Sequence, residues 1–84
     1  MVREIVKRDT ILIPVPLEDH VEGPTVVEAK VRELVTQAYQ YRSRMGWTTI
    51  VMGMDEYLPS PGERLDPHSI MYMVRVEHRY NRPA

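Results

Sequence analysis

The stretch that decides the fold covers residues 25–46 and reads TVVEAKVRELVTQAYQYRSRMG. Its apolar side chains recur at steps of three and four, the spacing that gathers them on one face of an α-helix. The members of this stripe are Val27, Val31, Leu34, Ala38, Tyr41 and Met45. The stretch therefore predicts one long amphipathic helix of about five turns with a single apolar face.

Both ends of this helix carry signals of their own. Thr25 and Glu28 have the spacing of a capping box, in which the threonine hydroxyl accepts from the third amide and the glutamate reaches back. Pro24 stands where a helix start tolerates proline. At the other end Gly46 can adopt the left-handed conformation that stops a helix. We therefore predict that the helix starts at Thr25 and stops before Gly46.

The segments on either side of the helix are typical of β-strands. Residues 10–15 are rich in side chains that favour strands, and we expect this strand to begin as early as Glu4. Residues 47–52 have the same character, and we expect their strand to continue to Tyr57, with Gly53 as a bulge or close contact. Residues 70–80 alternate between apolar and polar side chains. A helix after a strand usually returns the chain parallel to that strand. This β-α-β-β order predicts an α+β fold, a small three-stranded mixed sheet with the helix on one face.

The remaining segments connect these elements within a single domain of residues 1–84, since 84 residues leave no room for a second core. Residues 17–23 carry three acidic side chains and are expected to form an acidic loop. Residues 58–69 contain three prolines and are expected to form a stiff Pro-rich loop. The C-terminal tail, residues 81–84, is expected to be disordered.

One helix can cover only one face of this sheet. Met71 and Met73 share the other face with arginines, and the strand after Gly46 is apolar on both faces. A strand that is apolar on both faces is normally covered on both. A second copy of the chain is the simplest cover, so we expect a homo-oligomer. The candidate interface residues are Met52, Met54, Met71 and Met73. Methionines also suit an irregular core or an adaptable ligand surface.

No recognisable catalytic or metal-binding constellation occurs. Cysteine is absent, which excludes disulfides and thiolate metal sites. The three histidines lie in separate segments, without the close pair that metal sites usually show. Neither a G-x-S-x-G motif nor a glycine-rich phosphate loop is present. We therefore expect binding rather than catalysis, with no catalytic residue, metal or cofactor.

The candidate ligand-binding residues are Arg75, Arg79 and Trp47. The two arginines suit an anionic ligand and the indole suits a planar one, such as a nucleotide held between subunits. Trp47 also suits a plain packing anchor after the helix stop. The net charge of −1 argues against nucleic acid, and no apolar run approaches the roughly 20 residues that span a membrane.

Two functions remain for this sequence. The first is a non-enzymatic homo-oligomeric interaction protein of the cytoplasm, either a structural or accessory component of an assembly or an inhibitor of a protein partner. The second is an oligomeric binder of a small anionic or planar ligand. Both require that the second face of the sheet meets another molecule.

Overall fold

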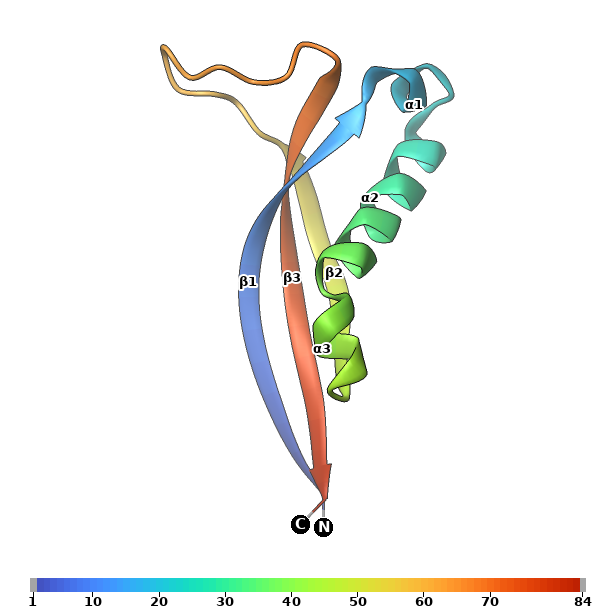
Figure 1. Cartoon of the computed structure of the whole chain (residues 1–84), viewed down its shortest axis with the longest axis vertical. Coiled ribbons are helices and arrows are strands. Elements are labelled where there is room, and N and C mark those ends of the chain that lie inside the picture. The colour runs from blue at the N-terminus through green and yellow to red at the C-terminus, as the bar shows by residue number, and fades with distance from the viewer. Residues whose placement is uncertain (1, 84) are drawn as a thin grey trace.

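The computed structural model describes the backbone of residues 2–83 and the side chains of residues 4–80. The elements are β1 (Val2–Pro16), α1 (Leu17–Val21), α2 (Pro24–Ala38), α3 (Gln40–Arg44), β2 (Trp47–Glu56) and β3 (Ser69–Pro83). Figure 1 shows the strands as one elongated sheet with the helices beside it. The predicted α+β class and β-α-β-β order of the main elements are confirmed.

The sheet has the order β1-β3-β2, and both pairings are antiparallel. The expectation of a mixed sheet is therefore wrong. β1 and β2 do run in the same direction, but β3 lies between them and separates them. β3 can pair along both edges because it contains no proline before Pro83, whereas Pro14 and Pro16 suit β1 to a sheet edge.

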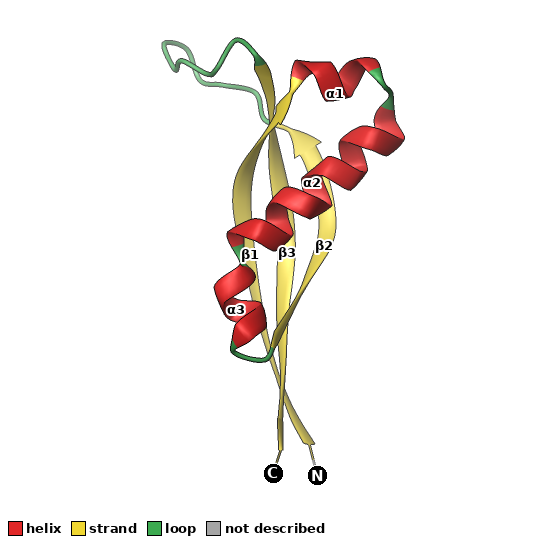
Figure 2. Cartoon of the chain, turned by 45° about the vertical axis from the view of Figure 1, so that its right-hand side comes forward, coloured by secondary structure: helices red, strands yellow, loops and turns green. Residues whose placement is uncertain are grey.

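The core forms between α2 and one face of the sheet. Figure 2 shows α2 crossing the strands diagonally. Val27, Val31 and Val35 of the helix pack against a cluster of strand residues. The buried strand members are Ile13, Val15, Val74 and Val76. The predicted stripe is thus confirmed for Val27 and Val31, and Leu34 packs partly buried against the same cluster.

The long helix is broken at Tyr39, which separates α2 from α3 with φ −109° and ψ 21°. The predicted single helix is wrong at this point. The break places the Tyr39 ring edge-on to His78, with ring centres 4.4 Å apart, and its hydroxyl donates to Asp9 Oδ2 at 3.3 Å. The last three members of the predicted stripe, Ala38, Tyr41 and Met45, are exposed.

The capping box does not form. α2 begins at Pro24, and Gly23 is its N-cap, so Thr25 lies inside the first turn and caps nothing through its side chain. Gly23 has φ 111° and ψ 172°, a backbone conformation that is open essentially only to glycine. Gly46 has φ 91°, which confirms the predicted left-handed stop after the helical segment.

The expected acidic loop at 17–23 is wrong in its first part, because Leu17–Val21 form the short helix α1. The Leu17 amide donates to the His68 carbonyl at 2.9 Å, and Glu18 and Asp19 occupy the first turn, where negative charge suits the helix dipole. The Pro-rich connection between β2 and β3 lacks regular structure, as expected, up to Ser69.

The expected disordered tail at 81–84 is corrected for its first three residues. The backbone of residues 81–83 continues β3 and pairs with β1, and Ala84 lies outside the described residues. β1 and β3 thereby extend beyond the helices at the end of the molecule that carries both termini (Figure 2).

A buried histidine lies beneath the helix break. His78 is only 1% exposed, and its Nδ1 lies 2.8 Å from the hydroxyl oxygen of Thr49, within hydrogen-bond distance. Its Nε2 has no protein partner among the described residues. Burial, followed by the positive charge of Arg42, lowers the pKa of His78, while Asp9 acts in the opposite direction. The imidazole is therefore held in its neutral form.

Acidification is expected to lower the free energy of unfolding through His78. As the pH falls through about 6.5, the unfolded chain takes up a proton that the folded chain resists, so unfolding becomes easier. The decrease in the free energy of unfolding levels off below the lowered pKa of His78 in the folded state. Above about pH 6.5 the histidine has no effect on the free energy of unfolding. Urea midpoints measured on both sides of this pH, for the unmodified chain and His78→Leu, check the prediction. An equal pH dependence in both proteins would contradict it.

Candidate functional site

The side of the sheet that faces away from the helices is the candidate site, and we call it the open face. Side chains alternate along each strand, so the residues between those of the core point to this side. β1 contributes Glu4, Val6, Arg8, Thr10, Leu12 and Pro14. β3 contributes Met71, Met73, Arg75, Glu77 and Arg79, and β2 contributes Thr48, Ile50, Gly53 and Asp55.

The end of the open face nearest the Pro-rich connection is apolar. Leu12 pairs across the strands with Met73, and Pro14 pairs with Met71. Leu12 is 44% exposed and Met73 is also exposed. Adjacent large apolar side chains that remain exposed to water favour contact with another molecule, because covering them removes apolar surface from water.

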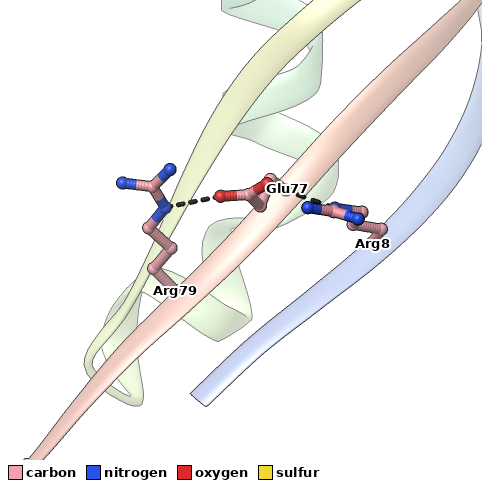
Figure 3. Close-up of polar contacts among 3 residues, drawn as sticks. All are labelled: Arg8, Glu77 and Arg79. Carbon is pink, nitrogen blue, oxygen red and sulfur yellow. Dashed lines mark hydrogen bonds and ion pairs between the residues drawn. The ribbon is translucent and has the colours of Figure 1, made fainter. Parts of the chain in front are cut away.

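The middle of the open face is charged and centres on Glu77. Arg79 Nε donates to one carboxylate oxygen at 2.5 Å, and Arg8 Nε donates to the other at 3.4 Å (Figure 3). Although no helix covers this side, Glu77 is only 4% exposed. The hydrogen bond from Arg79 lowers the pKa of Glu77, burial opposes that effect, and the bond from Arg8 adds to it. The carboxylate is therefore ionised, paired and largely shielded from water.

A β-bulge shapes the edge of this charged region. Val51 pairs with Val76 and Gly53 pairs with Arg75, so Met52 is the extra residue. A side chain on Gly53 would collide with the guanidinium of Arg75, which lies across the glycine and ends 3.7 Å from Asp55 Oδ2. Both predicted roles of Gly53, the bulge and the close contact, are confirmed.

A hollow of about 500 Å³ opens between these groups. Its lining includes Arg8, Asp9, Thr10, Met52, Arg75 and Glu77. Two arginines that retain exposed guanidinium groups therefore border a depression beside a carboxylate that is already paired. Such a depression can accept a side chain of a docked protein or a small anionic group.

The structure does not bring the three predicted ligand-binding residues together within one chain. Arg75 and Arg79 lie on the open face, on either side of Glu77 along β3. Trp47 lies on the helix side, where it is half-buried and stacks on Tyr80 with ring centres 5.2 Å apart. Lys7 and Arg42 lie over the same indole. This environment matches the alternative interpretation of Trp47 as a packing anchor.

The four methionines are also separated. Met71 and Met73 lie on the open face, and Met52 is exposed at the bulge. Met54 instead packs against the core on the helix side. The bulge causes this separation, because its extra residue reverses the alternation along β2 and turns Met54 inward. Met54 therefore does not contribute to the open face.

Sequence reasoning missed the contribution of β1, above all Arg8 and Leu12. The charged run Lys7-Arg8-Asp9 obscures the strand pattern before residue 10. The salt bridge from Arg8 to Glu77 joins residues 69 positions apart and depends on the register of β1 against β3.

Comparison of the chain with protein-family models, with curated proteins and with solved structures finds no significant match. Among the described residues, no group of three or more histidine or acidic side chains is placed to hold a metal ion. Nor does any described helix combine the length and apolar character needed to cross a membrane.

Proposed function

We propose that the protein is a non-enzymatic, homo-oligomeric interaction protein that associates through its open face. It would act as a structural or accessory component of an assembly, or as an inhibitor of a protein partner. One observation carries this proposal. The open face combines exposed apolar side chains, Leu12 and Met73, with a carboxylate, Glu77, that is only 4% exposed to water.

The paired state of Glu77 makes the open face easier to cover. Burying an unpaired carboxylate is strongly unfavourable, but Glu77 already accepts from Arg8 and Arg79 and loses little further hydration on contact. The Arg8 side chain stays 82% exposed, so its remaining donors can bind acceptors on a partner.

A second copy of the chain suits this surface. The open face carries acidic and basic groups together, with Glu77 and Asp55 beside Arg75 and Arg79. A face of one charge sign would repel its own copy, whereas a mixed face can place opposite charges in contact. In a two-fold pair the apolar end of each copy can also be covered by the other.

Replacing Met71 and Met73 together by lysine tests the proposal. The two new charges would have to be desolvated on association through the open face, so the mass of the assembly should fall while the chain stays folded. Sedimentation gives the mass and circular dichroism reports the fold. The matched control is Met45→Lys with Val21→Lys, two exposed apolar positions in the helical segments, which should leave the mass unchanged. An unchanged mass in the Met71 and Met73 variant would place the interface elsewhere.

The hollow supports a second candidate function, an oligomeric binder of a small anionic or planar ligand such as a nucleotide. Its size and its bordering arginines, Arg8 and Arg75, favour this alternative. Protein purified without added ligand would then carry an extra mass that denaturation releases. Arg75→Ala should lose that mass and keep the assembly. An assembly that carries no added mass would argue against the binder.

A further inference from the structure

The outer edge of β1 is a long strand edge that is open to pairing with another strand. Among the described residues, β1 pairs with β3 alone, and their register runs from Val2 to Pro16 without a bulge. In the described part of the chain no backbone hydrogen bond joins this edge to another segment. Proteins usually protect such edges with prolines, bulges or covering loops. In β1 the two prolines, Pro14 and Pro16, both lie at one end, and charged residues from Glu4 to Asp9 occupy the other part.

One contact shows which residues of β1 present their backbone outward. The Thr10 amide donates to the neighbouring carboxylate of Asp9 at 2.8 Å rather than into the sheet. In an antiparallel strand, residues two apart point their amide and carbonyl groups to the same side. The amide and carbonyl groups of Glu4, Val6 and Arg8 therefore point outward, available to an additional strand.

The charges along β1 favour some registers over others for pairing with a second copy. A two-fold axis perpendicular to the sheet must pass beside one residue, which then faces itself. An axis at Lys7, Arg8 or Asp9 would place like charges directly opposite each other, which destabilises strand pairing.

An axis at Val6 has the opposite result. It places Glu4 opposite Arg8 of the partner subunit, and symmetry repeats this pair of opposite charges on the other side. Val6 then faces its own copy, and both Val6 and Ile5 are exposed apolar residues. The side chain of Arg8 is 82% exposed despite its bond to Glu77, so it can also reach a second carboxylate.

We propose that β1 pairs antiparallel with β1 of a second copy, centred on Val6, to form one continuous six-stranded sheet. The inference rests on the proposed self-association but uses the sheet edge rather than the open face. Both sets of helices would lie on one side of the joined sheet. The two open faces would be continuous on the other side, which doubles the surface available for face-to-face assembly.

Single cysteines test this register, because the chain has no cysteine of its own. Opposed residues in an antiparallel pair have Cα atoms about 4.5–5.5 Å apart, within the range of about 4.4–6.8 Å that disulfides span. Mild oxidation of Val6→Cys should therefore shift the protein from single-chain to double-chain mass on a non-reducing gel. Thr10→Cys is the matched control, since its two copies would lie about 27 Å apart. Equal cross-linking of both variants, or none of Val6→Cys, would overturn the register.

A second pair of variants separates edge pairing from open-face packing, because Val6 also belongs to the open face. Ile5 and Lys7 point to the helix side and would face each other across the two-fold axis. A mixture of Ile5→Cys and Lys7→Cys should form the mixed disulfide in preference to either homodimer, and should still do so when Met71→Lys and Met73→Lys are added. If the mixed disulfide did not form in the chain with native Met71 and Met73, edge pairing would be overturned, independently of the result for the open face.

Discussion

Replacing Val31 by aspartate is expected to unfold the protein. Val31 is 0% exposed and lies on the α2 face that packs against β1 and β3. A carboxylate there has no described partner and would be desolvated or forced to take up a proton, at a cost of several kcal/mol. Domains are stable by about 0.05–0.15 kcal/mol per residue, so this loss removes most or all of the folding free energy. Far-UV circular dichroism should show loss of helix.

Val21→Asp is the matched control, because the same exchange is made at a residue that is 88% exposed. It should shift the free energy of unfolding by no more than about 0.5 kcal/mol. A Val31→Asp protein that retained its full helical signal would mean that the α2 face does not form the core.

The second large effect on stability is expected at Gly23, where alanine should cost about 1–3 kcal/mol. The cause is the backbone conformation, φ 111° and ψ 172°, since an added Cβ would meet nothing within 4 Å. Urea midpoints compare Gly23→Ala with Thr25→Ala, which should be nearly neutral because the threonine caps nothing through its side chain. If Thr25→Ala instead lowered the free energy of unfolding by about 1 kcal/mol, as the loss of an N-cap typically does, the result would mean that the capping box does form.

The parts of the fold that local periodicity determines could be predicted. The spacing of Val27 and Val31 identifies the buried helix face, and the alternation along β3 correctly places Arg75 and Glu77 on the side away from it. These patterns need only neighbouring residues. The break at Tyr39 could not be predicted, because it depends on contacts with Asp9 and His78, which the sheet supplies from distant parts of the sequence.

Strand order and register limited the prediction of the site in the same way. The sheet was expected to be mixed, but β3 lies in the centre and pairs on both sides. That arrangement brings Arg8 to Glu77, which no local pattern indicates. Gly53 did signal a bulge, yet the consequence for Met54 depends on which residue is the extra one. A shift of one residue in a strand moves every later side chain to the other face.

The most direct test of the open-face account is the native mass of the unmodified protein across a dilution series. One chain has a mass of 9.9 kDa. Association through the open face and through β1 predicts an even multiple of that mass, which falls to single chains only on dilution. A mass of 9.9 kDa at every concentration would contradict the account, because the open face would then be exposed to water in the stable form of the protein.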